Sequence, residues 1–247
     1  MKLASGEYIC FLDSDDMLLP DAIEKEVSFL DSHPEIGYVY GQFYKIDQEG
    51  RRLRAQKMRG GPQTCVRAGA EQIQQLLFRG DIGILSVLSR RSLVIEAGGF
   101  NTSMSVGEDI DLWFRLAQKR PVGYIAEAVG KVRMHPQNTL KKGAFERLEK
   151  FQTDFVAKAM NSLKNEPAFE NIRKRAYFGL YLYLCGEAAR KSRRTKGLLY
   201  LLKGLSVYPG LALRWDGFSF ILDASVSFLP QSMVKAGKNM LVGLKLR

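Results

Sequence analysis

The sequence contains few of the residues that build disulfide frameworks or zinc sites. Its 247 residues include three cysteines and two histidines. Cys10, Cys65 and Cys185 are odd in number and widely spaced, without disulfide or metal-ligand spacing, which indicates a reducing compartment, the cytoplasm. His33 and His135 leave little room for a zinc centre. These counts exclude the disulfide-stapled secreted domains and the zinc-binding modules.

Long apolar runs are also missing. The best of them, residues 197–213, is broken by Lys203 and Pro209, and it falls short of the roughly 18 residues that cross a bilayer. Lys2 is followed by a strand-like segment and carboxylates rather than by the apolar stretch of a signal peptide. We therefore expect a cytoplasmic protein without a transmembrane helix, peripheral at most on the inner face of the cell membrane.

Charge is distributed unevenly along the chain. Residues 1–130 carry 15 Lys+Arg against 18 Asp+Glu, whereas residues 131–247 carry 22 against 8. Basic residues within 190–196 precede the apolar segment 198–202. This pattern suits docking on an anionic membrane surface, but it also suits a solvated face of a helix packed on the domain. No nucleic-acid-binding motif accompanies the charge, so we expect no nucleic-acid partner.

An apolar segment that ends in carboxylates is the most informative local feature. Residues 8–12 have the length and composition of a buried strand, and Asp13, Asp15 and Asp16 follow at once. Ligands of open parallel sheets bind beyond the carboxyl ends of the strands, and carboxylates there suit a hard divalent cation. The alternative is a polar turn that caps the helix beginning near Pro20.

The order of elements predicts an α/β domain over residues 1–140 and a basic α-helical tail over residues 141–247. Apolar periodicity and Gly/Pro breaks support this division. The expected helices are 21–32, 70–78, 92–97, 108–119, 143–163, 167–191, 195–207 and 231–244. The first has Ile23, Val27 and Leu30 on one face, and Gly98-Gly99 ends the helix 92–97. The expected extended segments are 8–12, a strand pair within 36–46, 82–89 and 122–135.

Three motifs in order resemble family 2 glycosyltransferases of the A-type glycosyltransferase fold. The first is Ala-Ser-Gly-Glu-Tyr-Ile-Cys-Phe-Leu-Asp-Ser-Asp-Asp over residues 4–16, with Pro20 opening a helix. The second is the Gly-Gly-Phe turn at 98–100 followed by Gly-Glu-Asp at 107–109. The third is Arg-Met-His at 133–135 with Asn-Thr at 138–139. The resemblance covers residues 1 to about 140 and implies a partial Rossmann-like glycosyltransferase domain.

The resemblance implies transfer of a sugar, with inversion, from a nucleotide-diphosphate donor to a hydroxyl of a cell-surface glycan or lipid-linked acceptor. An inverting transfer needs a base, and the family's base is the Asp of its Glu-Asp pair, here Asp109. Asp109 shares the core-side face of its helix with Trp113, at the first turn, where the helix dipole favours an ionised carboxylate; helix capping alone is the alternative. Asp111 precedes Arg115 by four residues, and we expect a surface salt bridge. Trp113 is expected to contact the acceptor, and Glu108 is expected either to contact it or to cap the helix.

For the donor side, the resemblance makes Asp15 the direct ligand of Mn²⁺ or Mg²⁺. It places Asp13 on the donor's ribose or on metal-bound water, and His135 on the diphosphate or metal; a satisfied structural histidine is the alternative for His135. Arg133 could hold phosphate oxygens, because its planar guanidinium suits them. Asp16 is expected to be structural.

The sequence departs from the family at its start. The family's opening strand with Pro-x-Tyr-Asn and its second strand ending in Asp-Asp-Gly-Ser have no counterpart here. We therefore expect an N-terminally truncated form that is not a competent transferase alone. The rival hypothesis is a non-catalytic fragment that acts as a membrane-associated or partner-binding protein.

Overall fold

The computed structural model describes residues 3–53, 61–79, 82–135 and 145–209. The chain forms two compact units, Met1–Pro167 and Ala168–Arg247. Helix α6 (Phe145–Leu163) therefore belongs to the first unit and not to the tail that we expected to begin at residue 141. The expected helix 231–244 lies outside the described residues.

The first unit is built on a six-stranded mixed sheet. The strands follow the path β1-β5-β3-β6-β2, and β4 also pairs with β6. Their bounds are β1 (Tyr8–Cys10), β2 (Met17–Leu18), β3 (Tyr38–Ile46), β4 (Cys65–Arg67), β5 (Val87–Arg90) and β6 (Val122–Arg133). The segment 36–46 forms one strand rather than the expected pair, and a short 3-10 helix, η1 (Ile84–Ser86), replaces the start of the strand expected at 82–89.

Strand direction places three carboxyl ends at one edge of the sheet. β5 runs antiparallel to both β1 and β3, and β3 runs parallel to β6. β1, β3 and β6 therefore share one direction, although the sheet is not the all-parallel one that the carboxylate argument assumed. The loops after these three strands meet beyond the same edge, which is where a ligand site is expected.

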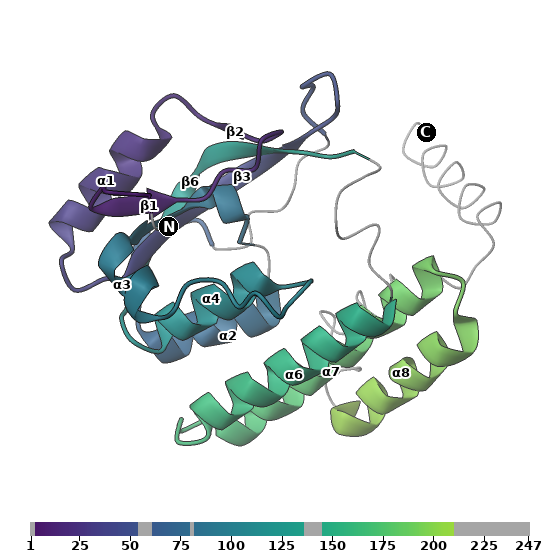
Figure 1. Ribbon diagram of the computed structural model, residues 1–247. Coiled ribbons are helices and arrows are strands. Elements are labelled where there is room, and N and C mark those ends of the chain that lie inside the picture. The colour runs from purple at the N-terminus through teal and green to yellow at the C-terminus, as the bar shows by residue number, and fades with distance from the viewer. Residues whose placement is uncertain (1–2, 54–60, 80–81, 136–144, 210–247) are drawn as a thin grey trace, which may run out of the picture. The chain divides into compact units, whose positions relative to one another are not determined.

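Helices cover both faces of the sheet. Figure 1 shows α1 (Ala22–Ser32) on one face, and α2 (Gly69–Arg79) and α4 (Glu108–Ala117) on the other. Neighbouring residues of β3 pack against the helices on opposite faces of the sheet, because successive side chains of a strand point to opposite faces. Val39 joins the cluster that contains Leu30 of α1, whereas the Tyr38 ring lies 5.6 Å from the Trp113 ring of α4.

Two glycines end the short helix α3 (Arg91–Glu96). Gly98 and Gly99 have φ values of +81° and +68°, which side-chain-bearing residues adopt at a cost, so the predicted Gly-Gly stop is confirmed. The chain then runs to Gly107, whose φ of +76° sets the direction of α4. The Gly-Gly-Phe turn and the Glu-Asp pair thus bracket one loop, residues 100–107.

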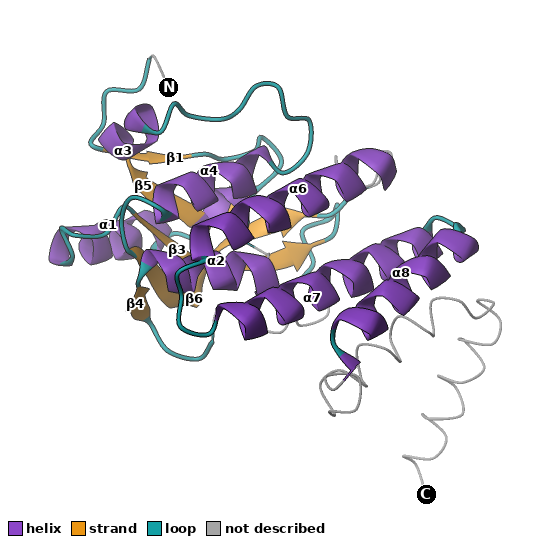
Figure 2. Ribbon diagram, turned by 90° about the horizontal axis from the view of Figure 1, so that it is seen from below, coloured by secondary structure: helices purple, strands orange, loops and turns teal. Residues whose placement is uncertain are grey.

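The second unit is an antiparallel helix pair. Helix α7 (Phe169–Arg190) turns at Ser192 into α8 (Arg194–Val207), and the two helices lie side by side in Figures 1 and 2. Gly204 of α8 lies against Phe178 and Tyr181 of α7, and a Cβ atom there would meet both at ordinary contact distances. None of the described helices is long and apolar enough to cross a membrane.

Candidate functional site

The acidic segment after β1 forms a turn that is tied to the end of β6. The Asp16 N–H donates to the carbonyl oxygen of Asp13 at 3.1 Å, and the Arg133 N–H donates to Asp16 Oδ1 at 2.8 Å. Burial raises the pKa of Asp16, and the neighbouring Asp15 and Asp13 charges raise it further. Asp16 therefore has the structural role expected from the sequence, and it leaves Asp13 and Asp15 in the turn.

Asp15 and His135 lie together. His135 Nε2 is 2.8 Å from Asp15 Oδ2, and both side chains are partly exposed. The two residues come from the loops after β1 and β6, which the shared strand direction brings to one edge. The sequence resemblance predicted that both take part in one site, and this contact supports that prediction.

Arg133 holds the site together through backbone carbonyls. Its Nε donates to the Asp15 carbonyl at 3.0 Å, and its Nη1 donates to the carbonyls of Asp47 and Gln48 at 3.1 and 2.7 Å. The guanidinium thus joins the acidic turn to the loop after β3. These bonds go to backbone carbonyls, so they do not test the predicted contact of Arg133 with donor phosphate.

The donor set can be compared with the needs of a divalent cation. Among the described residues, no group of three or more Asp, Glu, His or Cys side chains is placed to hold a metal ion. Mg²⁺ in nucleotide sites is usually held by one or two carboxylates together with substrate phosphates and water. Asp15 with its neighbour His135 fits that smaller requirement.

Asp109 stands at the first turn of α4, close enough to the acidic turn for the charge of Asp13 to act on it. Its Oδ1 accepts the N–H of Ile110 at 2.8 Å. Burial raises the pKa of Asp109 to about 6, and the negative charges of Glu108 and Asp13 add to this rise. The backbone N–H groups at the start of the helix lower this pKa, the direction expected from the helix dipole, but loss of hydration on burial outweighs them. A pKa near 6 still leaves the carboxylate mostly ionised at pH 7.

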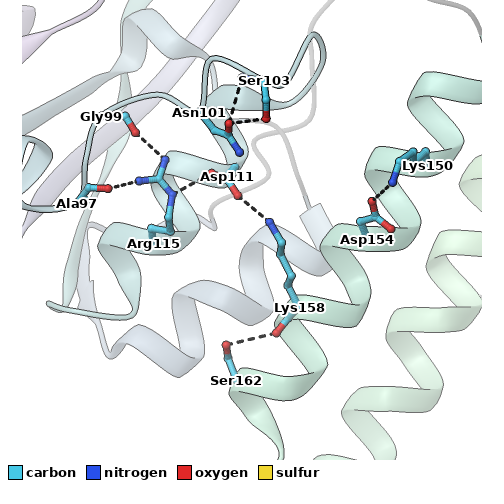
Figure 3. Close-up of polar contacts among 10 residues, drawn as sticks. All are labelled: Ala97, Gly99, Asn101, Ser103, Asp111, Arg115, Lys150, Asp154, Lys158 and Ser162. Atoms are coloured by element: carbon cyan, nitrogen blue, oxygen red, sulfur yellow. Dashed lines mark hydrogen bonds and ion pairs between the residues drawn. The ribbon is translucent and has the colours of Figure 1, made fainter.

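Asp111 occupies the other side of α4 and is not on the surface. Its side chain is 7% exposed, and it accepts bonds from Arg115 Nε at 2.8 Å and Lys158 Nζ at 3.2 Å. Arg115 also donates to the Ala97 and Gly99 carbonyls, as Figure 3 shows. The predicted pair with Arg115 is confirmed, but the predicted surface position is wrong, because α6 covers it.

The two expected acceptor contacts differ in accessibility. Glu108 is partly exposed at the start of α4, so it can reach a ligand. Trp113 is fully buried between α4 and the sheet, against Tyr38. The structure therefore contradicts an acceptor contact by Trp113, because its position on the same helix face as Asp109 is a core position.

Sequence reasoning missed the contribution of α6 to α4. Gly107 lies directly under the Phe151 ring, where a Cβ atom would approach ring carbons to 2.1 Å. Phe155 packs edge-on against Phe114 at 5.7 Å, and Lys158 reaches Asp111. The amphipathic pattern of residues 145–163 indicated a buried face, but the pattern does not say which element that face covers.

A second missed residue is Glu26. The buried face of α1 consists of Ala22, Glu26 and Leu30, rotated from the Ile23, Val27 and Leu30 face expected from the sequence. Ile23 is 42% exposed, whereas Glu26 is fully buried. Both carboxylate oxygens of Glu26 lack a hydrogen-bond partner among the described residues, and burial raises its pKa to about 8.

Comparison with known proteins shows what part of the chain is similar to. The model of glycosyl transferase family 2 matches residues 1–93, which include the acidic turn. Over these residues, 93 of the chain's 247, the chain is similar to glycosyl transferase family 2. It is 32% identical over 146 residues to an uncharacterized glycosyltransferase of Rickettsia conorii, covering 58% of this chain and 23% of that protein. It is 27% identical over 135 residues to the amylovoran biosynthesis glycosyltransferase AmsE of Erwinia amylovora, covering 54% of this chain and 47% of that protein.

The alignments span less than half the length of these relatives. The α/β fold with a helical C-terminal part agrees with the family. The family match ends before α4, so the roles of Asp109, Arg133 and His135 depend on geometry and on the motif resemblance.

Proposed function

We propose that this chain is a family 2 glycosyltransferase that transfers a sugar, with inversion, from a nucleotide-diphosphate donor to a hydroxyl of a glycan or lipid-linked acceptor of the cell envelope. The observation that carries the proposal is that candidate residues converge at one sheet edge. Asp15 contacts His135, and Asp13 lies close enough to Asp109 for its negative charge to raise the pKa of Asp109. These residues come from three separate segments, so a chance acidic turn is a poor explanation.

In the proposed reaction, Asp109 takes the proton of the acceptor hydroxyl while that oxygen forms a bond to the anomeric carbon. The bond from this carbon to the diphosphate oxygen breaks, and its electron pair leaves with the nucleotide diphosphate. A pKa of about 6 suits a base that must be ionised and yet accept a proton near neutral pH. Glu108, beside Asp109, is proposed to orient the acceptor.

Mn²⁺ or Mg²⁺, held by Asp15 and His135 together with diphosphate oxygens, would supply Lewis-acid neutralisation of the leaving group. Asp13 is proposed to contact the ribose. Arg133 is proposed to keep the acidic turn in place through its carbonyl bonds, with a phosphate contact as its secondary role.

Calorimetry with uridine diphosphate and Mn²⁺ tests the donor site in the full chain. Asp15→Asn should weaken metal-dependent binding strongly, whereas Asp21→Asn, an exposed aspartate paired with Lys25, should leave it unchanged. Unchanged binding in Asp15→Asn sinks the metal assignment. Absence of any binding by the wild-type chain favours the non-catalytic alternative.

Turnover measurements on the full-length enzyme test the base. Asp109→Asn should lower kcat by orders of magnitude while donor affinity stays roughly intact, as expected for loss of a proton acceptor. Asp111→Asn is the matched control on the same helix, and it should chiefly lower stability, because it weakens the bonds to Arg115 and Lys158. An inactive Asp111→Asn beside an active Asp109→Asn reverses the assignment.

We also propose that α8 docks on an anionic membrane surface, which suits a lipid-linked acceptor. Leu198, Leu199 and Leu202 are 53%, 49% and 56% exposed on one face of α8, and the exposed Arg193 and Arg194 stand at its start. Apolar side chains beside basic ones are typical of helices that lie in a membrane interface.

Vesicle co-sedimentation of the full chain tests this docking. Phosphatidylglycerol-containing vesicles should bind more protein than pure phosphatidylcholine vesicles at low salt, and Leu202→Gln should weaken the binding. Ile95→Gln is the control, since Ile95 is equally exposed but belongs to the first unit. Equal binding to both vesicle types, or none to either, rejects the proposal.

A further inference from the structure

A cavity of about 330 Å³ opens on the side of α4 opposite to Asp109. Loop 101–106 forms one wall and α6 forms the other, with Asp111 between them. Figure 3 shows the polar groups of this region: Asp111 points toward Lys158, and Asn101 and Ser103 lie in the loop. The cavity is therefore distinct from the acidic turn, to which Asp109 lies close.

The charges around the cavity are paired, with one exception. Lys158 bonds to Asp111 at 3.2 Å, and Lys150 bonds to Asp154 at 2.8 Å. Arg147 lines the same cavity, is exposed, and has no ion pair or hydrogen bond among the described residues. It is thus a free guanidinium, which can donate two parallel hydrogen bonds to a carboxylate or phosphate.

The rest of the lining suits a sugar ring. Phe151 and Phe155 supply apolar ring surface on the α6 side, where their rings lie 6.0 Å apart. Asn101 uses its Oδ1 to accept from the N–H and hydroxyl of Ser103, at 3.1 and 2.7 Å, so its amide N–H groups remain available as donors. Free donors beside an aromatic wall match a pyranose, which has an apolar face and hydroxyl oxygens around its rim.

We propose that this cavity, named here the α6 pocket, binds a pyranose that carries an anionic group, with Arg147 as the residue that recognises the charge. Resting on the proposed function, this sugar is a remote residue of the acceptor rather than the one that is glycosylated. Binding of a remote residue contributes free energy that helps to position the reacting hydroxyl. The acceptor class is therefore an acidic glycan.

Methionine-methyl NMR of the full chain provides a separate reporter for each site. Met104 lines the α6 pocket, and Met17 lies next to the acidic turn, with its sulfur 3.9 Å from Arg133 Nη2. Their signals are assigned with Met104→Leu and Met17→Leu. The probes are D-glucuronate, D-glucose 6-phosphate and D-glucose, each titrated at low salt. Uridine diphosphate with Mg²⁺ is titrated separately.

We expect the anionic sugars to shift the Met104 signal at concentrations at least about tenfold below those needed with D-glucose, since bonds to a charged group are the strong ones. The stronger of the two anionic probes identifies the group as carboxylate or phosphate. Arg147→Gln should remove this preference and Arg147→Lys should keep part of it. Lys164→Gln, which removes one charge just beyond α6 and outside the cavity, should leave it intact.

Three results overturn the proposal: no shift of Met104 with any probe, equal affinity for glucuronate and glucose, or an unchanged preference in Arg147→Gln. Loss of the shift in Asp15→Asn also overturns it, because binding would then depend on the acidic turn. Uridine diphosphate with Mg²⁺ should shift Met17 and leave Met104 unaffected. A missing Met17 response counts against the proposed donor site alone, so the two failures are distinguishable.

Discussion

Replacing Glu26 by glutamine should stabilise the protein at alkaline pH. Glu26 is fully buried on α1, and neither of its carboxylate oxygens has a hydrogen-bond partner among the described residues. Burial raises its pKa from 4.5 to about 8. The Glu26 charge acts on Cys10, whose thiol pKa is raised to about 11 by burial and by that charge. Among the described residues, no cation lowers the pKa of Glu26.

The direction of this pH dependence follows from how many protons the folded and unfolded states bind. Between pH 4.5 and about 8 the folded state holds a proton on Glu26 that the unfolded state has released. Stability from this group is therefore fully present below pH 4.5 and is lost as the pH rises through about 8. At about 1.36 kcal/mol per pKa unit, a rise from 4.5 to about 8 corresponds to a loss of roughly 5 kcal/mol. Glutamine has the same shape but never ionises.

Urea unfolding followed by tryptophan fluorescence measures the effect. The chain has two tryptophans, so Trp215→Phe leaves the buried Trp113 of the first unit as the reporter in both proteins. The stability difference between Glu26→Gln and Glu26 should be near zero at pH 4.5 and reach several kcal/mol at pH 8.5. Titrating groups that do not interact with Glu26 cancel in this difference, and Cys10, with a pKa of about 11, stays protonated in the folded state at pH 8.5. A pH-independent difference, or a destabilised variant at pH 8.5, refutes the reasoning.

Three other outcomes concern α4. Activity should rise with pH through about 6 and be lost below it, because Asp109 must be ionised to act as the base; a flat kcat/KM profile between pH 5 and 7 contradicts this. Lys158→Met should cost about 1 kcal/mol in urea unfolding, because it leaves the buried Asp111 with one partner fewer, whereas Lys150→Met at an exposed pair should cost under about 0.5 kcal/mol. Gly107→Ala should cost at least about 1 kcal/mol, since φ is +76° there; an unchanged unfolding midpoint rejects the strain.

Local chemistry allowed much of the fold to be predicted from sequence. The helices near 22–32, 69–79 and 108–117 and the extended segment 122–133 follow from apolar periodicity. The stop at Gly98 and Gly99 follows from the positive φ values that glycine adopts readily. The acidic turn after the first strand identified the candidate site, because few residue patterns end an apolar strand in several carboxylates.

Only the tertiary structure decided which side chains meet and which are buried. His135 joins Asp15 because β1 and β6 share one direction on either side of other strands, and sequence periodicity does not specify strand order. Helix α1 buries the face that contains Glu26 instead of the expected face that contains Ile23, because the two faces have similar apolar content. Asp111 is buried because α6 covers it, and that contact is long-range. Local pattern thus fixed the elements, whereas packing between distant segments fixed exposure, pKa and the partners of each carboxylate.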